Sequence, residues 1–393
     1  MRRKEFLKKT GKIVGVSSAL LLSGCDFFRQ DKEKNRDDKA EQLPGEKMND
    51  LKEPGRREGM FYEKLANGQA RCGICFHQCV IDPGERGFCR NRENIDGKLY
   101  LIVYGKPSAV HVDPVEKEPQ HHFLPGTNIY CVGTAGCNFR CNYCHNHHLS
   151  QSSIEELRYQ TLLPSDVVNE AVQEQVGAIS FTYNEPTALY EFMYDTARYA
   201  QDEAVGLIFH SNGSMQTEPL KELLKYTDSV TIDLKGFEES FYREISQAEL
   251  DPVLSSLKTI AASGTWLEIV NLVVTDLNDA PQHIEPMCQW IKAELGPEVP
   301  VHFTRFSPSY KMTDTAPTPV PRLERARDIA RDKGIKYVTI GNVPGHEYNS
   351  TFCPECDQML IHRHHFSVAE NNIENGQCPN CGLEIAGVWS LSS

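Results

Sequence analysis

The sequence of 393 residues is short of positive charge. Its 41 Lys and Arg residues stand against 54 Asp and Glu residues, so the formal net charge at pH 7 is −13. A dedicated nucleic-acid-binding protein needs a basic surface to neutralise phosphates, and this acidic balance argues against that class of protein. The N-terminus also lacks a long apolar run, because the stretch 13–22 is too short to cross a bilayer as a helix of roughly 20 residues.

Apolar residues are scarce between positions 26 and 59, where Lys, Glu, Asp and Arg dominate. Such a segment cannot bury enough apolar surface to offset the entropy of ordering, so we predict a disordered charged tether over 26–59. The tether would connect an N-terminal signal to the folded part of the chain, which we expect to begin near Met60.

Residues 1–25 have the features of an export signal. A basic beginning that contains Arg2 and Arg3 precedes the apolar stretch and the sequence Leu-Ser-Gly-Cys, which ends at Cys25. This resembles a bacterial lipoprotein signal with twin-arginine character, although the twin-arginine spacing is one residue longer than usual. The resemblance implies that Cys25 is lipidated and anchors the chain at the inner membrane, on either face. An uncleaved amphipathic leader and a cytoplasmic location are the alternatives.

Cysteine, in contrast, is abundant, with 14 residues whose spacing is not that of a small secreted disulfide scaffold. Eleven of them fall into three groups with the spacing of metal ligands. Of the other three, Cys131 is expected in a buried strand and Cys288 on the buried face of a helix, while Cys25 belongs to the signal.

The middle group has the spacing Cys-x3-Cys-x2-Cys and consists of Cys137, Cys141 and Cys144. A structural zinc site takes four ligands, and a [4Fe-4S] cluster normally takes four thiolates, one for each iron. Three thiolates therefore predict a cluster with one open iron, which can chelate a small molecule. The alternative is an ordinary metal-stapled turn, whose fourth ligand would be one of His145, His147 and His148.

Two further groups have four cysteines each. The N-terminal group has the spacing Cys-x2-Cys-x3-Cys-x9-Cys and predicts a closed metal site, either structural zinc or an iron–sulfur cluster, with two disulfides as the alternative. Its members are Cys72, Cys75, Cys79 and Cys89. The C-terminal group has two Cys-x2-Cys pairs and predicts a zinc ribbon, with a rubredoxin-like iron site as the alternative. Its members are Cys353, Cys356, Cys378 and Cys381.

Between these groups, short apolar segments alternate with segments of helical periodicity. We expect a helix over 167–175 capped by Ser165, and further helices around 189–197, 284–291 and 322–332. Repeated strand–helix units form a parallel sheet, and six of them predict an α/β fold with a partial (β/α)6 barrel. Polar residues follow the strands, and such barrels carry their active sites at the C-terminal ends of the strands. The expected strands lie at 129–132, 178–181, 207–209, 230–232, 267–274 and 301–303, with a final segment at 336–340.

The complete set of motifs resembles a known family. The three-cysteine motif is similar to that of radical S-adenosylmethionine (SAM) enzymes. From about Phe61 onward, the chain resembles the radical SAM enzyme of the AmmeMemoRadiSam system, a relative of the glycyl-radical-enzyme activases. The resemblance also rests on both outer cysteine groups and on Asp-Pro-Val-Glu-Lys at 113–117, Tyr-Asn-Glu-Pro at 183–186, Ser-Asn-Gly at 211–213, Asp-Leu-Lys-Gly at 233–236 and Gly-Asn-Val at 341–343.

This resemblance implies a barrel that binds SAM and a [4Fe-4S] cluster whose open iron holds the amino and carboxylate groups of SAM. The cluster would cleave SAM reductively to a 5′-deoxyadenosyl radical, which abstracts hydrogen from an unidentified substrate. Implied partners are a low-potential electron donor of flavodoxin or ferredoxin type and proteins of Memo-like and AMMECR-like type. The alternative function is a membrane-tethered iron–sulfur or zinc protein that transfers electrons or acts as a scaffold without catalysis.

The resemblance also carries residue roles over by position, without implying a catalytic residue. Tyr143 would lie against the adenine of SAM. A second set would hold the amino group, the carboxylate and the ribose, and it comprises Asn184, Glu185, Ser211, Asn212, Asp233 and Lys235. His302 would approach the ribose or the adenine. We therefore expect a signal at 1–25, a tether at 26–59, an N-terminal four-cysteine domain at 60–115, a radical SAM barrel at 116–347 and a zinc ribbon at 348–393.

Overall fold

The computed structural model describes residues 55–391. The expected signal, Cys25 and most of the expected tether lie outside the described residues. Regular structure begins a little earlier than the expected position 60, because strand β1 (Arg57–Glu58) pairs with β6 (Lys98–Leu101). Arg57 also forms an ion pair of 3.2 Å with the buried Asp195, which explains why this end of a charged stretch is ordered. No helix in 55–391 has both the length and the apolar character needed to cross a membrane.

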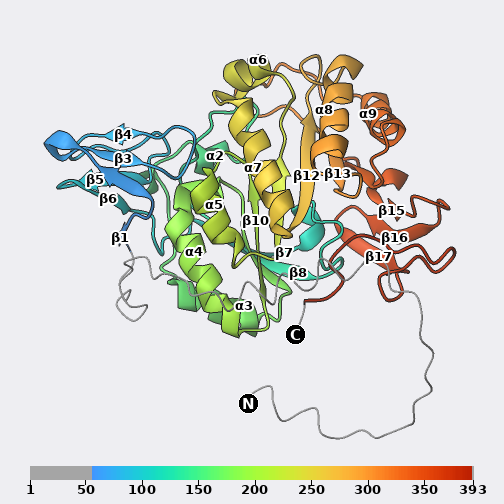
Figure 1. Cartoon of the computed structure of the whole chain (residues 1–393), viewed down its shortest axis with the longest axis horizontal. Helices are drawn as coiled ribbons and strands as arrows, with labels where there is room; N and C mark the ends of the chain where they lie inside the picture. Colours follow the sequence, from blue (N-terminus) through green and yellow to red (C-terminus); the bar gives the residue numbers. More distant parts are fainter. Residues whose placement is uncertain (1–54, 392–393) are drawn as a thin grey trace, which may run out of the picture. The chain divides into compact units, whose positions relative to one another are not determined.

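An eight-stranded sheet forms the centre of the described part (Figure 1), in the order β14-β13-β12-β11-β10-β9-β8-β7. Its strands β8 to β14 are parallel, and β7 pairs with β8 in the antiparallel direction. The strands are β7 (Ala109–Pro114), β8 (Asn128–Gly133), β9 (Ala178–Phe181), β10 (Gly206–Ser211), β11 (Ser229–Asp233), β12 (Trp266–Val273), β13 (Val301–Arg305) and β14 (Val338–Gly341).

The partial barrel is therefore confirmed, but it has seven parallel strands rather than six, and residues 113–114 form the end of β7. Pro114 is tolerated there because β7 lies at the edge of the sheet, where a missing N–H leaves no ladder bond broken. The segment 336–340 supplies the seventh parallel strand, β14. Cys131 and Cys288 are buried, as expected.

Helices cover the outer side of the sheet (Figure 1). The helix expected over 167–175 begins at Pro164, and its first turn is capped by Asp166, whose Oδ2 accepts from Leu163 N at 2.9 Å. Ser165 is therefore not the cap, because a proline suits the first helical position and moves the start forward. The helices are α3 (Pro164–Gln173), α4 (Tyr190–Tyr199), α5 (Thr217–Leu224), α7 (Leu250–Ser263), α8 (Pro281–Glu294) and α9 (Val320–Asp332), with the short α2 (His147–Ser150) and α6 (Glu239–Phe241).

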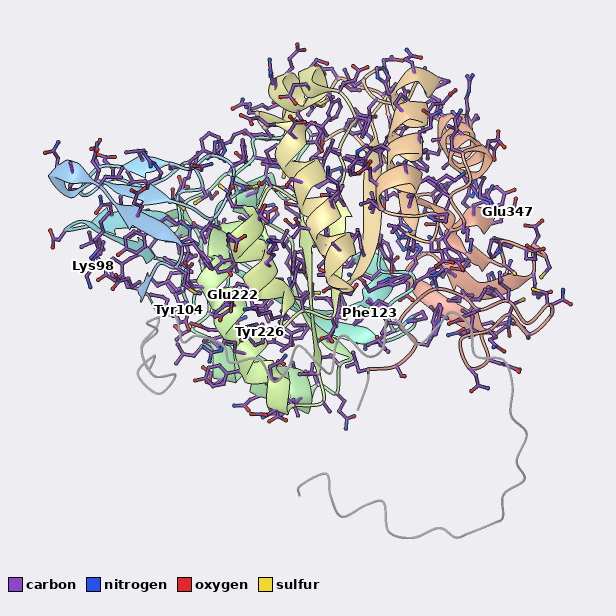
Figure 2. All side chains as sticks on the ribbon, viewed as in Figure 1. Lys98, Tyr104, Phe123, Glu222, Tyr226 and Glu347 are labelled. Carbon is purple, nitrogen blue, oxygen red and sulfur yellow. The ribbon has the colours of Figure 1, made fainter. Side chains whose placement is uncertain are left out.

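The N-terminal cysteine group lies among two small antiparallel sheets, one formed by β1, β6 and β5 (Arg92–Ile95). The other contains β2 (Tyr62–Lys64), β3 (Ala70–Cys72) and β4 (Val80–Ile81). Two buried polar contacts join these sheets to α4. Arg92 forms two hydrogen bonds of 2.9 and 2.7 Å with Glu191, and Tyr104 (Figure 2) donates to Asp195 at 2.8 Å. The N-terminal region is thus attached to the barrel by hydrogen bonds that are buried from solvent.

The C-terminal region is a three-stranded antiparallel sheet of β15 (Thr351–Phe352), β16 (Met359–His364) and β17 (Ser367–Asn371). Its chain then returns to the barrel, where Val388 N donates to His122 O at 2.7 Å and Val388 O accepts from Leu124 N at 2.8 Å. The β16–β17 turn contains His365 and Phe366, which line the central cavity described below.

Candidate active site

One cavity of about 460 Å³ opens among the C-terminal ends of the parallel strands. The thiols of Cys137, Cys141 and Cys144 line it. The same cavity is lined by every side chain that the sequence analysis assigned to SAM, namely Tyr143, Asn184, Glu185, Ser211, Asn212, Asp233, Lys235 and His302. Apart from His302, which is near the start of β13, these residues follow or end different strands, and the shared register of a parallel sheet brings them together.

The loop that carries the three thiols is held by its backbone. Gly136 has a φ of +82°, and a Cβ at this position would collide with the carbonyl of Cys89 and lie 2.7 Å from Asn91 Oδ1. Asn184 Oδ1 accepts from Thr134 N at 3.0 Å, and its Nδ2 donates to the carbonyls of Ala135 at 3.1 Å and Gly136 at 2.9 Å. The Asn184 amide, which was expected to hold the amino group of SAM, thus has three partners in the cluster loop.

The environment of the thiols suits metal ligation. Burial raises the pKa of Cys137 and Cys141, so both thiols are protonated at neutral pH unless cations stabilise the thiolate. Phe139 N donates to Cys137 Sγ at 3.3 Å, and Cys144 Sγ lies 3.2 Å from Ser150 Oγ. The loop therefore provides three sulfur donors, of which Cys141 is buried and Cys137 and Cys144 are half-buried.

The three thiols do not form a group as compact as that expected around a single metal ion. Thiolates around one zinc lie at most about 4.6 Å apart, because each Zn–S bond is about 2.3 Å. Among residues 55–391, the C-terminal group is the only set of three or more His, Cys, Asp or Glu side chains whose ligand atoms all lie within 4.8 Å of one another. The three thiols are thus spread more widely, and neither His145, His147 nor His148 completes a compact site with them.

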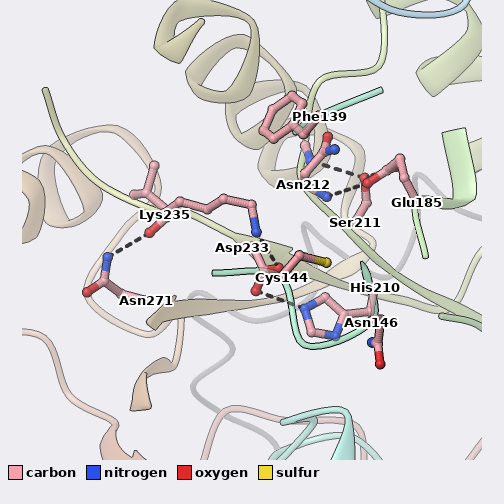
Figure 3. A network of polar contacts seen from close by, with 12 residues as sticks. Phe139, Cys144, Asn146, Glu185, His210, Ser211, Asn212, Asp233, Lys235 and Asn271 are labelled. Carbon is pink, nitrogen blue, oxygen red and sulfur yellow. Dashed lines mark hydrogen bonds and ion pairs between the residues drawn. The ribbon is translucent and has the colours of Figure 1, made fainter. Parts of the chain in front are cut away.

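Glu185 joins the ends of β9 and β10 (Figure 3). Its Oε1 accepts from Thr187 N at 3.0 Å and from Ser211 Oγ at 2.7 Å, while Oε2 accepts from Asn212 N at 2.8 Å. Asn212 Nδ2 in turn donates to Asn138 Oδ1 at 2.8 Å, within the cluster loop. This network fixes a negative charge beside the three thiols.

Asp233 forms a second charged group at the end of β11 (Figure 3). Its Oδ1 lies 3.0 Å from His210 Nε2, and its Oδ2 accepts from Lys235 Nζ at 2.9 Å. Burial opposes ionisation, but the attraction of Lys235 and His210 outweighs it and holds the pKa of Asp233 below its usual value. Burial lowers the pKa values of Lys235 and His210, but Asp233 and other neighbouring acidic groups together raise them above their usual values. His210 is absent from the predicted site residues because the predicted strand ends at 209, two residues before the end of β10.

The side chains of Tyr143 and His302 both have polar partners within the protein. The Tyr143 hydroxyl is buried and forms a hydrogen bond with Ser246, and the side chain lines the cavity. His302 is near the start of β13, and its ring nitrogens lie 2.8 Å from Glu268 Oε2 and 2.7 Å from Thr339 Oγ1. Both ring nitrogens of His302 therefore have protein partners, and its contact with SAM stays a prediction.

The C-terminal cysteines form a compact site. Their four sulfur atoms lie within 4.8 Å of one another, with 3.6 Å between the Sγ atoms of Cys353 and Cys381 and 3.7 Å between those of Cys356 and Cys378. These distances match sulfurs around one ion. The group can therefore hold a metal ion.

Three comparisons relate the chain to known proteins. The Radical SAM superfamily model matches residues 131–291. An uncharacterized protein of Methanocaldococcus jannaschii is 44% identical over 331 residues, which are 84% of this chain and 98% of that protein. The pyruvate formate-lyase 1-activating enzyme of Escherichia coli K12 is 24% identical over 219 residues, which are 51% of this chain and 87% of that enzyme. A solved radical SAM methyltransferase from Sphaerobacter thermophilus is 14% identical with a TM-score of 0.44, covering 56% of this chain and 67% of that one.

The donor set and the cavity fit the cofactors of this superfamily. Three thiols leave one coordination position of a [4Fe-4S] cluster open, and the adjoining cavity offers carboxylates, a lysine and the Tyr143 side chain to SAM. When bound, the cluster supplies the electron for reductive cleavage of SAM. The chain, distantly related to the pyruvate formate-lyase-activating enzymes, belongs to the radical SAM superfamily and is an enzyme that cleaves SAM through a [4Fe-4S] cluster.

Proposed function

We propose that this enzyme uses SAM to abstract hydrogen from a substrate as the radical SAM member of an AmmeMemoRadiSam system. The observation that carries the proposal is that the three thiols and the expected SAM contacts share one cavity of about 460 Å³. Small-molecule sites commonly measure about 300–1,000 Å³, so the cavity can hold SAM with part of a substrate. The motifs at 113–117, 183–186, 211–213, 233–236 and 341–343 support the choice of system.

In this proposal, the residues of the chain bind and orient SAM. Lys235 attracts its carboxylate, and Glu185 attracts its ammonium group, because opposite charges form the stronger hydrogen bonds. Ser211 and Asn212 hold Glu185 in place, and Asp233 is available to the ribose hydroxyls. The Tyr143 ring offers a flat face to the adenine. Asn184 and His302 act as positioning residues, because their polar atoms already have protein partners.

The test is reductive cleavage of SAM by the full chain. Anaerobically reconstituted protein is mixed with SAM and dithionite, and 5′-deoxyadenosine is measured by mass spectrometry. Wild type is expected to form it and Cys141→Ala is expected to lose at least a hundredfold in rate. Cys288→Ala is the matched control, since it removes a buried thiol outside the cavity and should retain activity. Formation of 5′-deoxyadenosine by Cys141→Ala at the wild-type rate would contradict the assigned ligands.

The assignment to a system has its own test. Memo-like and AMMECR-like proteins encoded by neighbouring genes are added to the same reaction together with cell extract fractionated by size. A product whose formation depends on both SAM and these proteins, in step with 5′-deoxyadenosine, supports the system. Equal rates and products with and without them would refute it.

The metal and membrane assignments are further parts of the proposal. The compact C-terminal group is assigned one zinc ion, which metal analysis of the full chain would detect as one zinc per protein. Lipidation at Cys25 would place the protein at the inner membrane, and protease treatment of spheroplasts would identify the face. Wild-type protein found wholly in the soluble cytosol would refute the anchor.

A further inference from the structure

The N-terminal group of four cysteines also surrounds an interior cavity. Cys72, Cys75, Cys79 and Cys89 line it together with apolar side chains that include Ile74. All four are free thiols in the structure, so the two disulfides considered from the sequence are not formed. The region therefore offers four thiol sulfurs as metal ligands around one cavity.

The distances between the sulfurs separate one metal ion from a cluster. The C-terminal group shows what this chain does with a single-ion site, since its four sulfurs lie within 4.8 Å of one another. In the N-terminal group, as in the loop of Cys137, no three sulfurs meet that limit among the described residues. Sulfurs that face one cavity but stand too far apart for one ion suit a cluster, in which each thiolate binds a different iron.

The two groups of thiols adjoin each other. Asn138, which directly follows Cys137, lines the N-terminal cavity, and its carbonyl lies 2.8 Å from His77 Nε2. The Asn138 side chain also forms a hydrogen bond with the Cys75 thiol. On the other side, the carbonyl of Cys89 touches Gly136, which directly precedes Cys137. The two cavities are thus separated by little more than one turn of the cluster loop.

Arg140 forms a third connection. Its Nη1 donates to Cys137 O at 2.7 Å, its Nη2 donates to Phe88 O at 2.5 Å, and its guanidinium lies 3.9 Å from the centre of the Phe88 ring. Phe88 directly precedes Cys89. A positive charge is therefore shared between the two sites, which favours the extra negative charge that either would gain on reduction.

We propose that Cys72, Cys75, Cys79 and Cys89 bind a second [4Fe-4S] cluster, which passes the electron for SAM cleavage to the cluster at Cys137, Cys141 and Cys144. In this step, a reduced flavodoxin or ferredoxin gives up one electron, the second cluster gains and then loses it, and the first cluster gains it. No proton moves and no bond forms or breaks. The proposal deepens the proposed function, because the second cluster supplies the reductant for the same site.

Metal analysis of the full chain tests the site. Each cluster contains four irons, so wild type is expected to hold about eight irons, about eight sulfides and about one zinc. About four irons with about two zincs would overturn the proposal while leaving SAM cleavage intact, so this failure is distinguishable from failure of the proposed function. The variant Cys137→Ala/Cys141→Ala/Cys144→Ala should retain about four irons with an EPR signal that SAM does not change. This variant leaves the N-terminal cysteines unchanged, so its iron content does not depend on whether an altered N-terminal site folds.

Electron transfer is tested by comparing two reductants. The rate of 5′-deoxyadenosine formation is measured with dithionite, a small chemical reductant, and with reduced flavodoxin. In Cys75→Ser, the ratio of the flavodoxin-driven to the dithionite-driven rate should fall at least tenfold relative to wild type. The matched control is Cys288→Ser, whose ratio should equal that of wild type. An unchanged ratio in Cys75→Ser that has lost about four irons would refute the electron-transfer role.

Discussion

The substitution Asn184→Ala distinguishes two roles that the sequence and the structure assign to the same side chain. Its motif predicts contact with the amino group of SAM, whereas its amide is bonded to the backbone of Thr134, Ala135 and Gly136. The carbonyl of Ala135 keeps a second donor in Asn91 at 2.7 Å. The substitution therefore strands two buried backbone groups, the N–H of Thr134 and the carbonyl of Gly136.

Each stranded buried group costs about 1–3 kcal/mol, so the variant is expected to lose about 3 kcal/mol of folding free energy. The unfolding entropy is about 2.1 cal/mol/K for each residue, which makes this loss a fall of about 4 °C in Tm. Because Gly136 adjoins Cys137, the reconstituted variant should also hold less iron and lose it faster in air. These effects should be present without SAM.

Thermal unfolding, iron content and SAM affinity of the reconstituted proteins provide the assay. Asn142→Ala is the matched control, because this half-buried asparagine lies in the same loop and makes one long hydrogen bond of 3.5 Å. It should show wild-type iron content. If Asn184→Ala has wild-type Tm and iron content and only weaker SAM binding, the positioning role is wrong and the contact with SAM is correct.

Three further outcomes are expected. His210→Gln removes an imidazole whose pKa is raised by Asp233 in the folded state. The resulting loss of about 1–2 kcal/mol in folding free energy should be complete below pH about 6.5 and should shrink as the pH rises through the folded-state pKa. Measurement of Tm from pH 6 to pH 9 checks this. Cys356→Ser should lose the C-terminal metal and expose residues 348–391 to proteases, since metal binding stabilises such modules directly; equal resistance of wild type and variant to limited proteolysis would contradict this. Arg92→Met should lower the free energy of unfolding by about 3–5 kcal/mol, because the buried Glu191 carboxylate loses its ion-pair partner. Adding Glu191→Leu should restore part of this free energy in urea unfolding. A double variant less stable than Arg92→Met would contradict this account.

The sequence was sufficient for features that depend on local pattern. Residues 178–181 were expected as a strand and form β9, because a short apolar run between polar residues specifies a buried parallel strand. The gathering of Glu185, Asn212 and Asp233 around one cavity has the same origin. Parallel strands in common register must present the residues after their C-terminal ends at one edge of the sheet.

The sequence was insufficient where partners come from distant segments. His302 pairs with Glu268 and Thr339, so its nitrogens are occupied by residues 34 and 37 positions away. Strand β7 is only partly buried, and its formation depends on antiparallel pairing with β8. Helices α5 and α7 were not expected. Each carries a proline in its first turn, where the structure tolerates it although proline commonly indicates a break in a helical pattern.

The cluster loop depends on the N-terminal region as much as on the barrel. Asn91 donates to Ala135 O at 2.7 Å and to Ala188 O at 3.2 Å, and the carbonyl of Cys89 leaves room only for glycine at position 136. Arg92, the next residue, is fixed to α4 through Glu191. A barrel without residues 55–108 would therefore lose donors to its own cluster loop and expose the buried charge of Glu191. The three thiols and the N-terminal cysteine group consequently form one folding unit, so the binding of metal at either group should stabilise the other.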